Sequence, residues 1–474
     1  MTVWPAGLVA RWHSYGPVRR VFAALGVFLS TIAFVCIALI TIELIAARAI
    51  NTRSTALNSI EKASPQQIER GAYLAKVGNC AACHTARGGA AFAGGLALHT
   101  PFGAVYTSNI TPDASTGIGS WGADAFYRAM HDGISANGRL LTPACPYPNY
   151  THVTRDDSDA LYTYFMQGVQ PVVQANRAHD LPFPLNTQVA LAAWRVMFFE
   201  RGSTTIATKN AADKNVASQA EITKVSNQND SKNIQNIERG GYLVRGLGHC
   251  SACHAQRNAL GATINDQSLS GALMPMQDWY APSLMDASQA GVMHWPQADV
   301  VSLLKTGVAP HASVAGPMAE VVSKSTQYWT DTDLQAAAAY LQSLPEVKPF
   351  NNGKPSQSPL LPRGQELFTQ HCATCHGANG QGLQVQGSVA LPALAGNRAV
   401  TMHNTANLVR IVLAGGYAPS TAGNPRPFGM PPFVHVLNDE DIAAVTSYIR
   451  FSWGNKAEPV SATDVVRHRK GLLQ

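Results

Sequence analysis

Residues 80–84 read Cys-Ala-Ala-Cys-His, and the pattern returns as Cys-Ser-Ala-Cys-His at 250–254 and as Cys-Ala-Thr-Cys-His at 372–376. C-x-x-C-H is typical of covalent c-type haem attachment, in which two thiols bind the haem vinyl groups and the histidine ligates the iron. Chance predicts roughly 0.004 such motifs in a chain of this composition. The predicted haem-binding and iron-ligating residues are Cys80, Cys83, His84, Cys250, Cys253, His254, Cys372, Cys375 and His376.

Two other uses of paired cysteines are a zinc ribbon and a redox dithiol. A zinc ribbon needs its two C-x-x-C units close together, whereas these pairs lie 170 and 122 residues apart. A redox dithiol does not require a histidine after each pair. The motifs therefore favour three covalent haems c, and because c-type maturation occurs outside the cytoplasm, we expect the globular part to be periplasmic.

The sequence around each motif also repeats. An Arg-Gly pair precedes each motif within 68–74, 237–243 and 361–367, and a later segment places an aspartate seven residues before a tyrosine. These aspartate–tyrosine pairs are Asp157 and Tyr164, Asp333 and Tyr340, and Asp441 and Tyr448. We expect the aspartates at the starts of helices, where they suit the cap and the helix dipole. Middle helices are predicted to end at Gly133, Gly307 and Gly415.

These repeats predict a mainly α fold with three tandem c-type cytochrome domains and long loops, preceded by one transmembrane helix. The predicted parts are a cytoplasmic N-terminus (1–20), a transmembrane anchor (21–47), domain 1 (60–200), a polar linker (201–235), domain 2 (236–345), a Pro-rich linker (346–360), domain 3 (361–455) and a basic tail (456–474).

The N-terminal segment has 22 uncharged residues from Val21 to Ile42. As a helix they span roughly 33 Å, enough to cross a bilayer core. Arg11, Arg19 and Arg20 precede the segment, and the positive-inside rule places them in the cytoplasm. A cleaved signal peptide is the alternative, with a small-x-small site at 47–49, but its apolar region would be shorter. We therefore expect a single anchor in a bacterial inner membrane, with the haem domains in the periplasm.

Each haem iron also needs a ligand opposite the histidine, usually methionine in electron-transfer domains. Met318 in Gly-Pro-Met and Met430 in Gly-Met-Pro-Pro follow the middle helices of domains 2 and 3 and are the predicted ligands. In domain 1 the equivalent loop holds Cys145. Cys145 is either a thiolate ligand or a small buried thiol beside an iron that is five-coordinate or uses another residue. The other candidates there are Met130, His131, His152 and Met166.

The composition excludes several functional classes. The formal charge of +6 would be offset by about six ionised haem propionates, and there is no dense Lys/Arg run, so no nucleic-acid partner is expected. No Ser/His/Asp arrangement, phosphate-binding glycine loop or flavin motif is present. We therefore predict no catalytic residues for substrate chemistry.

These residues together resemble the triple-haem cytochrome c subunit of membrane-bound alcohol and aldehyde dehydrogenase complexes of acetic acid bacteria, and related subunits of gluconate and sorbitol dehydrogenases. Besides the three motifs, the resemblance rests on residues 107–113, 117–119, 146–150, 316–322 and 325–328. It implies that the chain takes electrons from a catalytic dehydrogenase subunit and passes them to ubiquinone in the membrane. The alternative is a haem enzyme, a peroxidase or small-molecule reductase, using an open iron in domain 1.

Three features depart from the family pattern. Cys145 stands where the family has methionine, and the 201–235 linker is long. The N-terminal segment resembles an anchor, whereas the alcohol dehydrogenase subunits of the family resemble cleaved secretory proteins. These departures weigh against a PQQ quinoprotein as the catalytic partner. They leave room for a molybdopterin aldehyde dehydrogenase with an iron–sulfur subunit.

Overall fold

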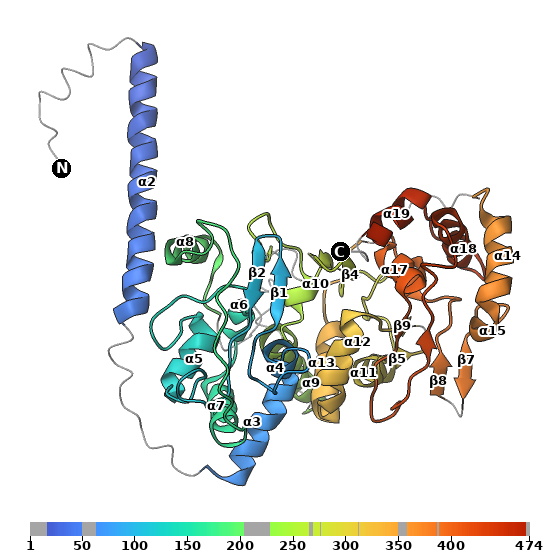
Figure 1. The fold of residues 1–474 in the computed structure, drawn as a ribbon, viewed down its shortest axis with the longest axis horizontal. Helices are drawn as coiled ribbons and strands as arrows, with labels where there is room; N and C mark the ends of the chain where they lie inside the picture. Colours follow the sequence, from blue (N-terminus) through green and yellow to red (C-terminus); the bar gives the residue numbers. More distant parts are fainter. Residues whose placement is uncertain are drawn as a thin grey trace, which may run out of the picture.

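The computed structural model folds the described residues into helices joined by long loops, with one helix standing apart from the body (Figure 1). The described residues are 17–49, 63–202, 228–264, 269–274, 276–310, 312–348, 358–385 and 388–470. We call residues 63–202 the first unit, 228–348 the second unit and 358–470 the third unit. Most of the predicted 201–235 linker and much of the predicted 346–360 linker lie outside the described residues.

Secondary structure follows the same broad order in each unit. The separate helix is α2 (Pro17–Ala49). The first unit contains α3 (Pro65–Val77), α4 (Cys80–His84), β1 (Ala97–Thr100), β2 (Gly103–Tyr106), α5 (Ala123–Asp132), α6 (Tyr147–Tyr150), α7 (Arg155–Gln167) and α8 (Gln188–Phe198). The second contains α9 (Gln228–Gly241), η4 (Tyr242–Leu247), α10 (Ser251–His254), β3 (Ala272–Met274), β4 (Trp279–Ala281), α11 (Gln297–Thr306), β5 (Val308–Ala309), β6 (Ala312–Ser313), α12 (Pro317–Lys324), η6 (Thr326–Tyr328) and α13 (Asp331–Gln342). The third contains α14 (Leu361–His371), α15 (Ala373–His376), β7 (Leu383–Val385), β8 (Ser388–Leu391), α16 (Arg398–Thr401), α17 (Ala406–Ala414), β9 (Gly416–Tyr417), β10 (Gly429–Met430), α18 (Asp439–Phe451) and α19 (Ala462–Lys470).

The first and last helices of each unit cross at a glycine. The crossing pairs are α3 with α7, α9 with α13, and α14 with α18. A Cβ added to Gly71, Gly240 or Gly364 would lie only 2.0, 2.0 or 2.2 Å from a carbonyl oxygen of the partner helix. Real carbon atoms do not approach an oxygen this closely, so glycine is what allows these backbones to meet. The Arg-Gly repeat seen in the sequence therefore marks the helix crossing.

An arginine–aspartate ion pair closes each crossing. The pairs are Arg70 with Asp157, Arg239 Nε with Asp333 Oδ1 at 2.8 Å, and Arg363 Nε with Asp441 Oδ1 at 2.9 Å. The aspartates occupy the third helical position and are not the caps. The caps are Thr154, Thr330 and Asn438, whose side-chain oxygens accept the aspartate backbone N–H. The aspartates do lie in the first turn, as predicted.

The middle helices α5, α11 and α17 end at the predicted glycines. Gly133, Gly307 and Gly415 have φ angles of 62°, 79° and 67°. This left-handed region is costly for residues with a Cβ, so glycine is favoured there. The prediction of these helix ends is confirmed.

The second unit accommodates one extra residue before its haem motif. Gly71 precedes Cys80 by nine residues, whereas Gly240 precedes Cys250 by ten. The chain takes a π-helical turn, η4, at this point, and such a turn is how a helix absorbs a single insertion. The helix before it begins at Gln228, inside the segment predicted as linker.

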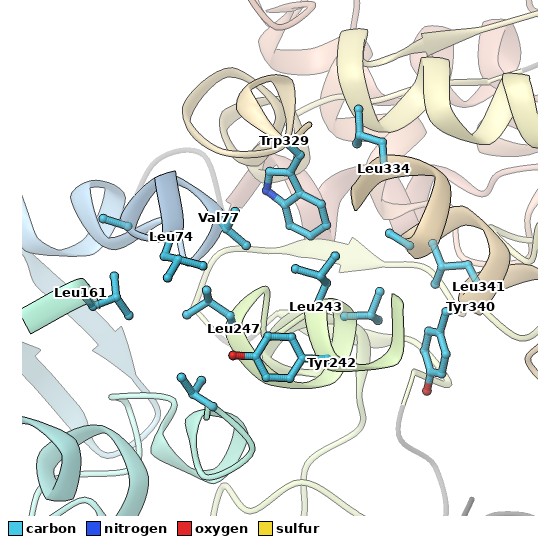
Figure 2. Packing of buried hydrophobic residues seen from close by; sticks show 14 of the residues in the cluster. Leu74, Val77, Leu161, Tyr242, Leu243, Leu247, Trp329, Leu334, Tyr340 and Leu341 are labelled. Atoms are coloured by element: carbon cyan, nitrogen blue, oxygen red, sulfur yellow. The ribbon is translucent and has the colours of Figure 1, made fainter. Parts of the chain in front are cut away.

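The first two units share one hydrophobic core (Figure 2). Leu74 and Leu161 of the first unit lie in the same buried cluster as Leu243, Trp329 and Leu334 of the second. The third unit has its own cluster around α14, α17 and α18. The three predicted domains are therefore not equivalent in packing, because two of them bury apolar side chains jointly.

Two tyrosine–aspartate hydrogen bonds tie these two units together reciprocally. Tyr73 Oη donates to Asp333 Oδ2 at 2.6 Å, and Tyr242 Oη donates to Asp157 Oδ2 at 2.5 Å. Each tyrosine thus binds the aspartate that closes the helix crossing of the other unit. The arrangement relates the two units by an approximate two-fold symmetry.

The C-terminal segment differs from the predicted basic tail. Residues Ala462–Lys470 form α19, which packs against α17 and α18. Val465 is fully buried, His468 Nδ1 lies 2.9 Å from Asp278 of the second unit, and Arg469 Nε donates to Asp439 at 2.6 Å. Val465 on the apolar side of α19 packs against the third unit, and this packing brings His468 and Arg469 to carboxylates. The positive charge of the basic cluster is therefore partly neutralised.

Candidate haem-binding sites

Each C-x-x-C-H motif forms a short helix directly after the first crossing helix of its unit. These helices are α4, α10 and α15, and each ends at the motif histidine. None of the eight cysteines is in a disulfide. A single helical turn places both thiols and the imidazole around one point, as covalent haem attachment requires.

Each motif histidine is oriented by a backbone carbonyl on a distant loop. The contacts are His84 Nδ1 to Ser108 O at 2.7 Å, His254 Nδ1 to Pro282 O at 2.7 Å, and His376 Nδ1 to Pro392 O at 3.2 Å. A carbonyl oxygen can only accept, so Nδ1 carries the proton and Nε2 keeps its lone pair. Burial lowers the pKa of all three histidines, which favours the neutral form that ligates a metal.

A glycine reinforces each of these loops, and the sequence alone did not reveal it. The backbone N–H groups of Gly94, Gly271 and Gly382 donate to the motif histidine carbonyls at 2.7, 2.8 and 2.9 Å. All three glycines have positive φ angles, and an added Cβ would lie 2.4 to 2.5 Å from the chain that carries the histidine acceptor. They follow their histidines by ten, seventeen and six residues. This variable spacing hides them from a search for repeats.

Cys145 lies beside the first haem motif, just before α6. Burial, and then the neighbouring Cys83, raise the pKa of the Cys145 thiol to about 12. Burial, followed by the charges of Cys80, Cys145 and Cys83, raises the pKa of Tyr150. These three thiols therefore lie near one another and near Tyr150. A thiol with such a pKa stays protonated at neutral pH unless a cation such as ferric iron binds it.

The other candidates for this ligand position are Met130, His131, His152 and Met166. Met130 and Met166 pack against the core shared by the first two units. His131 Nδ1 lies 3.2 Å from Asp132 and its ring stacks on Tyr127. Cys80 packs against that same core, so these contacts do not select one ligand, and Cys145 stays a prediction.

Met318 and Met430 occupy different local structures. Met318 lies in the first turn of α12, after Gly316, rather than in the predicted loop. Met430 forms β10 with Gly429 and packs, together with Cys372, against the core of the third unit. Met430 and the third motif thus share one core.

Comparison with known proteins agrees with this geometry. The family model described as cytochrome c matches residues 361–453. The chain is 38% identical over 432 residues to the cytochrome c subunit of the quinone alcohol dehydrogenase of Gluconacetobacter polyoxogenes, covering 88% of this chain and 86% of the relative. This chain belongs to the cytochrome c subunits of dehydrogenase complexes.

Other relatives of this cytochrome c subunit serve different dehydrogenases. The gluconate 2-dehydrogenase cytochrome c subunit of Pantoea cypripedii is 37% identical over 449 residues, covering 90% of this chain and 95% of the relative. The fructose dehydrogenase cytochrome subunit of Gluconobacter japonicus is 34% identical over 434 residues, covering 86% of this chain and 83% of the relative.

Replacing Met318 or Met430 of the cytochrome c subunit by alanine tests the proposed thioether ligands. We expect each variant to lose the methionine-to-iron charge-transfer band of one haem and to lower its potential by on the order of 0.1 V, because thioether ligation raises haem potentials. Absorbance spectroscopy with redox titration measures both. Met276→Ala is the control, since Met276 is exposed in the same unit as Met318. Unchanged spectra in both test variants would contradict the assignment.

Proposed function

We propose that this cytochrome c subunit carries three covalent haems c and relays electrons from a catalytic dehydrogenase subunit to ubiquinone. The observation that carries the proposal is the threefold recurrence of one geometry: a C-x-x-C-H turn whose histidine Nδ1 is bound by a backbone carbonyl. A c-type haem supplies one-electron chemistry at its iron. The chain's own residues attach, orient and enclose it in three tandem cytochrome c domains.

In this proposal the thiols of the three motifs hold the haems, and His84, His254 and His376 ligate the irons. Met318, Met430 and Cys145 ligate the opposite faces. The backbone carbonyls that accept from Nδ1 of His84, His254 and His376 support these histidines as iron ligands. The position of Cys145 beside Cys80 and Cys83 supports Cys145 as the second ligand of the first iron.

Contacts made by the residues just before the first two haem motifs favour electron exchange between the two sites. His249 Nε2, next to Cys250, lies 3.3 Å from the carbonyl of Gly78, two residues before Cys80. Ser325 Oγ also donates to Val77 O at 3.0 Å. Together with the shared core, these contacts keep the two attachment sites at a constant separation. A fixed separation suits an electron relay, because the rate of electron transfer depends on the distance between the two haems. With that distance fixed, the electron need not wait for two separate proteins to bind.

The relatives support a dehydrogenase partner but differ in its substrate. Their names include alcohol, gluconate and fructose dehydrogenases. We infer that the cytochrome chain is the common part and that substrate chemistry belongs to another subunit. The partner of this chain is a molybdopterin subunit with an iron–sulfur subunit or a PQQ quinoprotein, and purification of the native complex followed by identification of its large subunit distinguishes them.

The structure supports a membrane location through α2. Its described side chains from Val21 to Ile37 are exposed, as expected of a helix that faces lipid and not of a soluble core. Among its described side chains, those near the C-terminal end pack on the first unit, where Glu43 pairs with the buried Arg195 at 2.7 Å. We infer from the positive-inside rule that the arginines at the start of the helix are cytoplasmic and that the haem domains are periplasmic.

The haem count tests the proposal directly. We expect the denatured mature chain to exceed the mass of its polypeptide by three haems, because each motif forms two thioether bonds. The double variant Cys372→Ala/Cys375→Ala should carry two, whereas Cys145→Ser should still carry three. Intact mass spectrometry measures all of them. Two or fewer haems on the fully matured wild type would refute the proposed architecture.

Retention of the N-terminal helix is a separate prediction. Signal cleavage after the small-x-small site at 47–49 would remove Glu43, which pairs with Arg195 at 2.7 Å, and the apolar residues Ile40, Leu44 and Ala47 that pack on α8. Because the first unit would lose these contacts, we expect the helix to be kept. N-terminal sequencing of the membrane-extracted protein decides, and a mature chain that begins at Ile50 would contradict it.

A further inference from the structure

Helix α8 has polar side chains on its inner side and apolar side chains on its outer side, the opposite of a helix whose outer side faces water. Its two most polar side chains point inward. Gln188 exchanges hydrogen bonds with the backbone of Leu140 at 2.8 and 3.2 Å, and Arg195 is buried against Glu43. Its outer side instead carries Val189, Val196 and Met197, which are 57%, 41% and 56% exposed. We call these three residues the α8 patch.

The spacing of the patch gives one continuous apolar face. Positions 189, 196 and 197 fall within about 100° of one another on a helix. Arg195 lies on the opposite side and Ala192 borders the patch beside Val196, and both are buried. With 11 residues, α8 is roughly 16 Å long, too short to cross a bilayer of about 30 Å. A helix of this length and polarity suits a position in the plane of a membrane surface.

The contacts of α8 place it at the depth of that surface. One face of α2 is partly or fully buried against the first unit. Among the described side chains this face carries Ile40, Glu43, Leu44 and Ala47. The 19 residues from Val21 to Leu39 span roughly 28 Å, close to a hydrocarbon core. The segment 40–47 therefore emerges where the bilayer ends.

Helix α8 packs on this emerging segment. Leu191 and Ala192 share a small core with Ile40, Leu44 and Ala47, and Figure 1 shows α8 beside the part of α2 that meets the body. The α8 patch is thus carried by a helix that packs on the segment of α2 just after the predicted membrane span. This position, and the lack of any charged side chain on the outer face of α8, favour lipid over a protein partner as its occupant.

We propose that α8 is an interfacial helix whose patch inserts into the outer leaflet, giving the first unit a second attachment besides α2. The inference rests on the proposed membrane anchor. Phe199, directly after α8, packs on Tyr147 with ring centroids 5.0 Å apart, and Tyr147 lies two residues after Cys145. The two attachments together hold the first haem site close to the membrane surface, where a membrane-soluble quinone is accessible.

Photolabelling from within the bilayer tests the proposal. The haem-loaded full chain is reconstituted into nanodiscs of phosphatidylethanolamine and phosphatidylglycerol containing a diazirine phospholipid, and adducts are mapped by mass spectrometry. We expect adducts on α2 and on the α8 patch. Tyr417 and Phe428 of the third unit serve as controls, because they are apolar residues more exposed than the patch that should remain unlabelled.

A double variant makes the test specific. Val189→Glu/Met197→Glu should reduce labelling of α8 at least about fivefold, since each charge opposes insertion, while labelling of α2 and the haem count stay unchanged. Labelling of α2 with none on wild-type α8 would overturn the interfacial helix and leave the anchor intact. Absence of labelling on α2 itself would instead refute the anchor in the proposed function.

Discussion

Replacing Cys145 by methionine is expected to raise the potential of one haem by about 0.2 V or more and to leave the other two unchanged. A thiolate is a stronger donor than a thioether and holds a negative charge against the iron, which stabilises the ferric state. Cys145 lies near Cys80 and Cys83, so the first haem is the one affected. Its wild-type potential should then lie below those of its neighbours.

Redox-titrated EPR of the wild type and of Cys145→Met measures this effect. The matched control is Cys36→Ser, because Cys36 is an exposed cysteine in α2, remote from the motifs. If Cys145→Met alters neither the g-values nor the potential of any haem, Cys145 is not a ligand. Ready binding of CO or cyanide by the wild type would show an open iron and support the alternative haem-enzyme function.

A low-potential first haem would also bear on the catalytic partner. Such a haem accepts electrons well from a low-potential donor such as an iron–sulfur cluster, which favours a molybdopterin enzyme with an iron–sulfur subunit. A PQQ quinoprotein would not need an electron acceptor of such low potential. The measured potential therefore tests our inference about the partner as well as the ligand.

Substituting alanine at Gly240 is expected to destabilise the first and second units together by about 3 kcal/mol, whereas Gly364→Ala should destabilise only the third. The added Cβ would meet a partner-helix carbonyl at 2.0 Å in one case and 2.2 Å in the other, so each crossing must shift. Leu243, three residues after Gly240, is fully buried in the core shared by both units. The effect therefore spreads across that core.

Hydrogen exchange resolved by peptide distinguishes the two variants. Gly240→Ala should speed exchange in α3 and α7 as well as in α9 and α13, while Gly364→Ala should act on α14 and α18. Gly122→Ala and Gly423→Ala are controls, because an added Cβ at either position has nothing within 4 Å. Faster exchange confined to the second unit in Gly240→Ala would mean that the first two units fold independently.

Some features of the site were within reach of the sequence but not recognised. Arg70 and Asp157 each recur in all three units, so their pairing could have been predicted from the repeat. The role of Gly94 could not be predicted, because the equivalent glycines Gly271 and Gly382 lie at different distances along the chain from their motif histidines. Helix α19 was missed because its basic cluster dominates the pattern, while its carboxylate partner Asp278 lies 190 residues away from His468.

What the amino-acid sequence determined by itself is local. Covalent haem attachment needs two thiols and an imidazole within five residues, and a helix ends at Gly133 because of the backbone at that residue, so both were readable along the chain. The tertiary structure alone decided which units share a core, which carbonyl orients each histidine, and which side of α8 faces outward. These depend on pairs such as Tyr73 and Asp333, 260 residues apart, whose meeting is set by packing of whole helices and not by any spacing in the sequence.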